Sequence, residues 1–274
     1  MQVRAAERRD NPAIAALVAA DPVTHCFAAH HLAERRRLAR APRDVLVAVS
    51  GGRVDAAVVL GANLIPLGTS GASRAAFAPV LARQGRRCSS IVGPAAEVLP
   101  LWHELDPVWG PARDVRARQP LLSMAVPSTV PVDPAVRPAR ADEVDVLMPA
   151  AVAMFTEEVG VSPLSGGTGQ LYRRRVAELV GRGWVFARIE DGRVVFKAEL
   201  GAVSPAACQV HGVWVAPDLR GQGLAAPAMS AVVRLALEIA PKVTLYVNDF
   251  NTPALRAYAR VGFTDVGQYA TVLF

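Results

Sequence analysis

Two spacings of hydrophobic positions alternate along this chain and predict short strands and longer helices. The apolar runs Val45–Ser50 and Trp184–Ile189 each precede a Gly-Arg turn and a second apolar run, as in a β-hairpin. Ala-, Val- and Leu-rich stretches with spaced polar residues are typical of helices. In the first half, the patterns predict helices at 11–20, 26–40, 73–84 and 95–104, and strands at 45–50, 54–61, near Leu64, 88–92 and 113–125. In the second half, they predict helices at 141–159, 168–181, 222–239 and 252–260, strands at 184–190, 193–202, 208–216 and 243–248, and a final strand pair at 263–273.

The order of elements is nearly the same in the two halves, and short sequences recur. Val3-Arg4-Ala5-Ala6 resembles Val136-Arg137-Pro138-Ala139, and the stretch 52–62 shares six of eleven residues with 192–202. The order predicts an α+β fold of two tandem domains, each a mostly antiparallel sheet flanked by helices. A Pro-rich stretch separates them, so we predict domains at 1–126 and 139–274 with a linker at 127–138.

Composition favours a globular chain with its own cores. The 274 residues are 52% hydrophobic, which is ample for burial without metal or disulfide staples. The mean hydropathy of +0.26 reflects the many Ala residues, since no apolar run approaches the ~18 residues of a spanning helix. The N-terminus is charged with both signs, and Cys26, Cys88 and Cys208 are few and far apart. We therefore expect reduced thiols, no membrane partner and a cytoplasmic location.

The net charge of +6 lies entirely in the first half. Residues 1–130 carry 16 basic and 10 acidic side chains, whereas residues 131–274 carry 14 of each. The Arg residues are scattered and no aromatic residues interleave with them, so nucleic acid is an unlikely partner. Cys26 and His30 share a predicted helix face, but no second ligand pair stands at a zinc-like spacing, and we expect no metal.

The segment 213–225 carries the most specific local pattern. A Val- and Trp-rich strand ends at Pro217, and a short loop with Gly221 and Gly223 leads into a predicted helix. This arrangement points free backbone N–H groups and the helix dipole at one spot, which suits a pyrophosphate. Glycines let the backbone approach the phosphates closely. The spacing fits neither the dinucleotide fingerprint nor the P-loop, which excludes those two readings.

This segment, Val-x-Val-x-Pro-x-x-Arg-Gly-x-Gly-x-Ala, resembles motif A of the GNAT family of N-acetyltransferases. One strand later, Asn251-x-x-Ala254-x-x-x-Tyr258-x-x-x-Gly262-Phe263 resembles motif B. The resemblance covers residues 136–274. The whole chain is similar to actinobacterial GNAT proteins whose N-terminal domain is uncharacterised. The first half lacks Arg-x-x-Gly-x-Ala, so we expect it to be a degenerate GNAT-like copy and coenzyme A to bind only the second half.

The resemblance implies acetyl-CoA as co-substrate and direct transfer of its acetyl group to a primary amine. The residues that it assigns to coenzyme binding lie in the two motifs: Val213, Trp214, Val215, Arg220, Gly221, Gln222, Gly223, Leu224, Ala225, Asn251 and Ala254. Backbone amides near Val213 and Val215 would bind the pantetheine arm where the strand from Val243 splays away. Strand alternation puts His211, Val213 and Val215 on one face and Trp214, as a core residue, on the other.

Three catalytic candidates follow, and the base stays open. Tyr258 would protonate the leaving thiolate, since an ordinary Tyr pKa of ~10 suits an acid. Glu199, on the third strand of its domain, and His211, with an intrinsic pKa near ~6.5, are alternative general bases. A relay through water, with neither residue as base, is the third alternative. Asn251 would bind the coenzyme or its water, cap the following helix, or do both.

The acceptor is not readable from the sequence. A small-molecule amine and a peptide or protein both fit, and a homodimer is left as an open alternative. The Gly-rich stretch 162–169 is a candidate loop over the acceptor, and Gly68-Thr69-Ser70-Gly71 stands at the phosphate-loop position of the first repeat as a vestige. A mycothiol-synthase-like activity is a rival, because that enzyme also resembles two GNAT repeats with one active half. A CoA-binding regulatory or scaffold protein without catalysis is the rival from another class.

Overall fold

A computed structural model describes residues 1–37 and 44–274, which fall into two compact units. Unit 1 comprises Met1–Leu122, Tyr246–Asn251 and Asp265–Phe274, and unit 2 comprises Ser123–Leu245 and Thr252–Thr264. Both units are discontinuous, whereas the division predicted from the sequence is continuous. The end of the predicted helix 26–40 lies outside the described residues.

Unit 1 contains seven strand segments in the described residues, in the order β1-β2-β3-β4-β5-β12-β6. Its elements are β1 (Gln2–Ala5), α1 (Asn11–Ala20), α2 (Cys26–Arg37), β2 (Val45–Ser50), β3 (Arg53–Val59), β4 (Asn63–Leu67), α3 (Gly71–Gln84), β5 (Ser90–Pro94), α4 (Ala95–Trp109), most of β6 (Asp114–Met124) and most of β12 (Thr264–Leu273). Phe77 and Leu81 of α3 and Leu101 of α4 pack with apolar residues of the sheet into one core. β4 and β5 are parallel.

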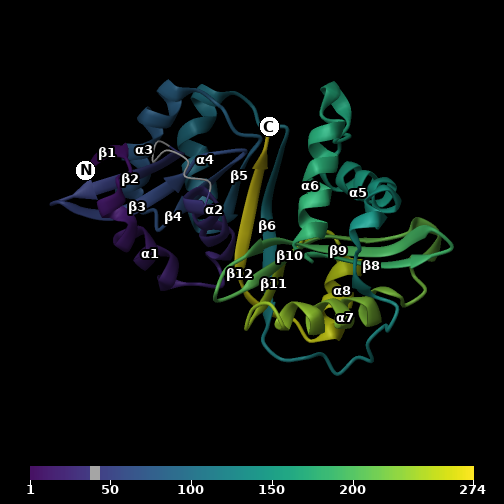
Figure 1. Cartoon of the computed structure of the whole chain (residues 1–274). Coiled ribbons are helices and arrows are strands. Elements are labelled where there is room, and N and C mark those ends of the chain that lie inside the picture. Colours follow the sequence, from purple (N-terminus) through teal and green to yellow (C-terminus); the bar gives the residue numbers. More distant parts are fainter. Residues whose placement is uncertain (38–43) are drawn as a thin grey trace. The chain divides into compact units, whose positions relative to one another are not determined.

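Unit 2 is built on the strand order β11-β10-β9-β8-β7. Its elements are β7 (Arg137–Pro138), α5 (Val144–Val159), α6 (Gly169–Gly181), β8 (Val185–Glu190), β9 (Arg193–Val203), β10 (Cys208–Val215), α7 (Ala225–Leu237), most of β11 (Val243–Tyr246) and α8 (Thr252–Val261). Within this unit α5 and α6 lie on one side of β8, β9 and β10, and α7 and α8 lie on the other (Figure 1). β10 and β11 are parallel, and the other pairings are antiparallel.

The predicted α+β class is confirmed, and most predicted elements are present within a few residues. Three differences stand out. The final strand pair is one strand, β12, which pairs with β5. The helix predicted from residue 222 begins at Ala225, because residues 220–224 form the glycine loop before it. The short strands β1 and β7 escaped prediction because two to four residues give no detectable alternation.

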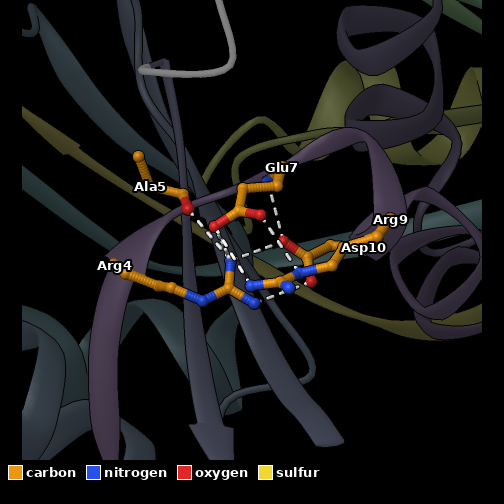
Figure 2. A network of polar contacts seen from close by, with 5 residues as sticks. All are labelled: Arg4, Ala5, Glu7, Arg9 and Asp10. Atoms are coloured by element: carbon orange, nitrogen blue, oxygen red, sulfur yellow. Dashed lines mark hydrogen bonds and ion pairs between the residues drawn. The ribbon is translucent and has the colours of Figure 1, made fainter. Parts of the chain in front are cut away.

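The sequence repeat is also a structural repeat. In unit 1, the guanidinium of Arg4 donates to both carboxylate oxygens of Asp10 at 2.6 and 2.8 Å, and the Glu7 N–H donates to Asp10 at 2.7 Å (Figure 2). In unit 2, Arg137 holds Glu143 in the same way at 2.8 and 2.6 Å, and the Arg140 N–H completes the network. The Arg137 guanidinium lowers the pKa of Glu143 to about 2.

The first hairpins of the units share an irregularity as well. The β2–β3 ladder shifts register between Ala48 and Val49, and the β8–β9 ladder shifts between Arg188 and Ile189. These positions differ by the same 140 residues that separate Gly52 from Gly192. β-bulges are specific local features, so their recurrence supports one duplicated module. No helix among the described residues is both long and apolar enough to span a membrane.

Candidate active site

β10 separates from β11 after a very short parallel pairing. Only Cys208 and Gln209 of β10 pair with β11, opposite Val243 and Thr244. From Gly212 onward, β10 keeps its ladder with β9 but has no ladder partner on the other side among the described residues. The predicted splay at the strand from Val243 is therefore present. An unpaired strand edge offers backbone N–H and C=O groups to an extended ligand.

A bulge bends β10 at the same place. His211 lies opposite Glu199 and Trp214 opposite Lys197, so β10 uses three steps where β9 uses two. Gly212 provides the bend with φ +55°. The extra residue puts His211 and Trp214 on the same face of the sheet, because residues 197 and 199 share a face. The predicted alternation of His211, Val213 and Val215 on one face, with Trp214 opposite, is therefore wrong across the bulge.

Lys197 and Glu199 form an ion pair on the face covered by α5 and α6. Lys197 Nζ donates to Glu199 Oε2 at 3.0 Å and to the Gly212 carbonyl at 3.2 Å. The Lys197 side chain is 1% exposed and that of Glu199 is 13% exposed. Burial would raise the pKa of Glu199, but the Lys197 ammonium, with Arg175 and His211, outweighs it and holds that pKa below its usual value. Glu199 is thus an anion within reach of solvent.

His211 lies opposite Glu199 with its ring held on two sides. Nε2 is 2.8 Å from Gln209 Oε1, and the ring covers Gly201, where an added Cβ would lie 2.1 Å from Nδ1. Gly201 is therefore required by the imidazole of the neighbouring strand. The structure brings two predicted candidates, Glu199 and His211, to adjacent positions on one face.

The loop of residues 220–224 lies at the start of α7, as the motif predicts. Gly221 and Gly223 have φ values of +77° and +82°, and an added Cβ on either would meet no atom within 4 Å. No side chain of the described residues accepts a hydrogen bond from the N–H of these glycines. Gln222 Nε2 donates to the Asp218 carbonyl at 2.9 Å. Leu224 and Ala225 continue the loop into a helix whose N-terminus favours negative charge.

Arg220 and Trp214 share one carboxylate. Arg220 donates to the Val215 carbonyl at 3.0 Å and to Glu157 Oε2 at 2.8 Å, and Trp214 Nε1 donates to Glu157 Oε1 at 3.2 Å. Trp214 is buried and packs with α5 and α6, which confirms that it is mainly a core residue. Glu157, on α5, is a residue that the sequence reasoning missed, because its partners lie about 60 residues away.

Tyr258 lies buried in α8, and its ring meets Phe263 edge-on. Burial raises the pKa of its hydroxyl, and the carboxylate of Glu158 on α5 raises it further, so Tyr258 is protonated at neutral pH. Ala254 lies one turn earlier and is half-buried. Asn251 directly precedes α8 and is exposed, and its N–H donates to the Asn248 carbonyl at 2.9 Å.

The Gly-rich stretch 162–169 lies between α5 and α6 and forms hydrogen-bonded turns. Thr168 Oγ1 donates to the carbonyls of Pro163 at 2.6 Å and Ser165 at 2.8 Å. On α6, Tyr172 donates to the Ala151 carbonyl of α5 at 2.9 Å, and burial together with the Glu199 charge raises the pKa of its hydroxyl. Tyr172 was not predicted as a site residue. Its hydroxyl lies between α5 and α6, the two helices that cover the Lys197–Glu199 pair.

Unit 1 differs at the corresponding loop. Glu97 of α4 accepts hydrogen bonds from the Thr69 N–H at 2.7 Å and from Thr69 Oγ1 at 2.9 Å. His25 Nε2 is 3.9 Å from the other Glu97 oxygen. Between β4 and β5, an added Cβ on Gly93 would meet the Pro66 ring at 3.7 Å. The Glu97 side chain therefore occupies the loop of unit 1, and Pro66 lies close to Gly93 beyond the parallel pair.

The predicted Cys26 and His30 pair does not extend to a cluster. Among residues 1–37 and 44–274, no three His, Cys, Asp or Glu side chains converge as metal ligands. The His30 and His31 rings pack edge-on, and Phe27 meets His31 in the same manner.

Comparison with known families divides the chain in two. Residues 168–263 match the acetyltransferase (GNAT) family, and residues 44–147 match a domain family of unknown function (DUF4081). A mycothiol acetyltransferase of Corynebacterium aurimucosum is 44% identical over 62 residues. That alignment covers 22% of this chain and only 20% of the relative.

Solved structures of similar fold extend over both units. An acetyltransferase of the GNAT family from Colwellia psychrerythraea aligns over 100% of both chains with 13% identity and a TM-score of 0.58. A tandem GNAT protein from the clavulanic acid biosynthesis pathway covers 99% of this chain and 98% of its own, with 17% identity and a TM-score of 0.55. At such identities the likeness concerns the fold, which is that of tandem GNAT-like domains.

Proposed function

We propose that this chain, whose residues 168–263 match the acetyltransferase (GNAT) family, transfers the acetyl group of acetyl-CoA to a primary amine. The acceptor is a small molecule or a peptide. One observation carries the proposal: the edge of β10 after His211 has no ladder partner on one side among the described residues, and it leads directly into a glycine loop. Within the same described part of the chain, no side chain accepts from the N–H of Gly221 or Gly223. An extended ligand with a phosphate end fits that continuity.

The loop of unit 2 fits the pyrophosphate of the coenzyme. Gly221 and Gly223 leave open space where side chains would stand, and Arg220 adds a cation at the start of the loop. Gln222, Leu224 and Ala225 contribute backbone N–H groups at the α7 N-terminus. The amides of Val213 and Val215 would hold the pantetheine arm along β10. Asn251 and Ala254 are assigned to the coenzyme by the motif alone.

Bound acetyl-CoA supplies the activated thioester, and the side chains handle the charges and protons. Glu199 binds the ammonium of the acceptor, because it is anionic and reaches solvent. A base works best when its pKa lies near the working pH, which disfavours Glu199 and favours an imidazole. His211, opposite Glu199, therefore accepts the amine proton, directly or through water. Tyr258 donates its proton to the departing thiolate.

Acetyl-CoA turnover with a panel of amines tests this proposal. Thiol release should require an amine, and calorimetry should show one coenzyme site per chain. His211→Ala should lower kcat/KM by about 10²-fold or more while coenzyme affinity stays unchanged, which is typical of a lost general base. The absence of acetyl-CoA binding would overturn the proposal. Binding without turnover on any amine would favour a CoA-binding regulatory protein.

A mycothiol-synthase-like activity is a second candidate. The 44% identity to a mycothiol acetyltransferase over 62 residues favours it, although that segment spans a fifth of the relative. The two candidates differ in the acceptor alone. Turnover with deacetylated mycothiol, compared with simple amines and peptides of equal charge, separates them.

A further inference from the structure

We propose that Lys197 is a positioning residue, which ties the Glu199 carboxylate to the β10 bulge so that the acceptor anchor and the acyl-binding strand hold one geometry. The inference rests on the proposed function and assigns to that site a residue outside both family motifs. Lys197 does not touch substrate in this scheme. It acts through the two groups that it holds.

The ammonium of Lys197 joins two neighbouring strands, β9 and β10. Nζ donates to Glu199 Oε2 at 3.0 Å on its own strand, and to the Gly212 carbonyl at 3.2 Å on β10. Antiparallel pairing sets Lys197 opposite Trp214, on the far side of the bulge from His211. The ammonium therefore bridges the point where the β10 ladder is interrupted.

Gly212 is shaped to receive these side chains. A Cβ at this position would lie 3.2 Å from Lys197 Nζ, 3.3 Å from Glu199 Cδ and 2.8 Å from Met154 Cε. The left-handed φ of +55° and the crowding both require glycine here. The bulge conformation and the ion pair are thus packed against each other.

An ammonium buried to 1% exposure is costly unless it is paired and hydrogen-bonded. An apolar side chain would fill this position under α5 and α6 at lower cost, as Ala187 does opposite it on β8. What Lys197 adds is a fixed charge on Glu199 and a donor for a bulge carbonyl. Both additions position groups of the proposed active site, and neither is needed for apolar packing.

Other charges also face Glu199. His211 lies opposite on β10, Arg175 and Tyr172 face it from α6, and Glu158 of α5 acts on Tyr172. The strand on the other side, β8, presents the apolar Val185. Arg175 is exposed and Lys197 is buried, so solvent and salt screen the first much more than the second.

Three substitutions separate the two roles of Lys197. Lys197→Gln keeps a donor for the Gly212 carbonyl and removes the charge, Lys197→Arg keeps the charge, and Lys197→Met removes both. Lys242→Met is the matched control, because Lys242 is exposed in the same unit. Circular dichroism and melting establish that each variant is folded, and Lys197→Gln carries the test if Lys197→Met is not.

Two readouts decide the inference. Carboxyl carbon NMR, with the Glu199 signal assigned from Glu199→Gln, should show a raised Glu199 pKa in Lys197→Gln and the wild-type value in Lys197→Arg and Lys242→Met. In turnover, Lys197→Gln should raise the KM for the amine at least about tenfold and shift the acid limb of the pH profile upward, while coenzyme affinity stays within about twofold.

A folded Lys197→Gln protein with an unmoved Glu199 pKa overturns the inference, and so does an unchanged pH profile with an unchanged amine KM. The NMR titration needs no acceptor. If the wild-type protein acetylates no amine, the proposed function fails, and the titration still decides whether Lys197 fixes the Glu199 charge.

Discussion

The loops after β4 in unit 1 and after β10 in unit 2 are both glycine-containing and both lead into a helix, yet they differ in what meets their N–H groups. In unit 1, the Glu97 carboxylate accepts from the Thr69 N–H and hydroxyl, and Ser70 caps α3. In unit 2, Gly221 and Gly223 keep open space, and no side chain in residues 1–37 or 44–274 accepts from their N–H groups. An internal anion thus stands in unit 1 where unit 2 would take a phosphate.

The two units also differ in what lies beyond the short parallel strand pair of each unit. Each unit has a parallel pair that lasts two residues, Asn63–Leu64 with Ser90–Ile91 in unit 1 and Cys208–Gln209 with Val243–Thr244 in unit 2. In unit 1 Pro66 packs near Gly93 beyond the pair, and Pro has no N–H to offer. A glycine loop before a helix is therefore an anion site only when its own fold leaves it unoccupied.

Placing an anion in the unit 2 loop should convert it into a copy of unit 1. Gly223→Asp is expected to weaken coenzyme A binding by at least about 100-fold, because juxtaposed like charges cost several kcal/mol. Titration calorimetry with coenzyme A measures the change. Gly192→Asp is the matched control, since Gly192 also has a positive φ, +72°, and open space around it. Equal effects of the two changes would show backbone strain instead of charge.

The helices after the second parallel strands differ at one position. The seventh residue of α8 is Tyr258, whereas the seventh of α4 is the fully buried Leu101. Tyr258→Phe should lower kcat by about 10²-fold, typical of a lost general acid, and leave coenzyme affinity unchanged. Tyr269→Phe is the control in unit 1, where the hydroxyl donates to the Thr24 carbonyl. Unchanged turnover in Tyr258→Phe would remove its role as acid.

The sequence predicts these units well where the information is local. Hairpins and most helices depend on neighbouring residues and lie within a few residues of their predicted bounds, and the glycine loop 220–224 precedes a helix as predicted. Glu97 reaches Thr69 across 28 residues, and Glu157 reaches Arg220 across 63, so neither contact leaves a local signal.

The bulge of β10 was equally hidden, since a lone glycine in a strand has several readings. It changed which candidates share a face. Lys197 did leave a trace, because Lys197 and Glu199 are the only charged residues between Val194 and Val203 and stand two apart. The pairing of β12 with β5 could not be read from the sequence, because a strand pattern does not name its partner.

Glu97→Ala should destabilise the protein by about 2–3 kcal/mol, because it leaves His25 and the Thr69 N–H without their partner. Urea unfolding measures this loss. Calorimetry should still count one coenzyme site per chain, since Pro66 keeps the strand gap of unit 1 filled. Two sites in this variant would show that Glu97 alone had closed the unit 1 loop.

The same pair predicts a pH dependence of stability. Burial lowers the pKa of His25, but the Glu97 carboxylate outweighs burial, and the pKa in the folded protein is raised. The protonated His25 therefore stabilises the fold below pH ~6.5, and this stabilisation is lost as the pH rises through the pKa of the folded protein. Burial raises the pKa of Glu97, but His25 and Thr69 outweigh burial, and the pKa in the folded protein is lowered. The ionised Glu97 therefore stabilises the fold above pH ~4.3, and this stabilisation is lost on acidification. Glu97→Gln should flatten the loss of unfolding free energy as the pH rises above ~6.5. Parallel profiles for the two proteins would contradict the pairing.

The smallest expected effect concerns the carboxylate of Glu157, which pairs with Arg220 of the unit 2 loop. Glu157 holds Arg220 at 2.8 Å, and the two side chains are each 46% exposed. An exposed ion pair contributes about 0.2–1 kcal/mol. A coenzyme phosphate that binds Arg220 therefore loses little binding free energy by displacing the Glu157 carboxylate. Glu157→Gln keeps an acceptor for the Trp214 N–H and should tighten coenzyme A binding by at most about fivefold. Calorimetry at low salt measures it, with Glu178→Gln as control, because Glu178 forms a similar pair with Arg182 on α6. Weaker binding in Glu157→Gln would show that the carboxylate positions Arg220 for the phosphates, and the contrast with Glu97 would then be one of role as well as of place.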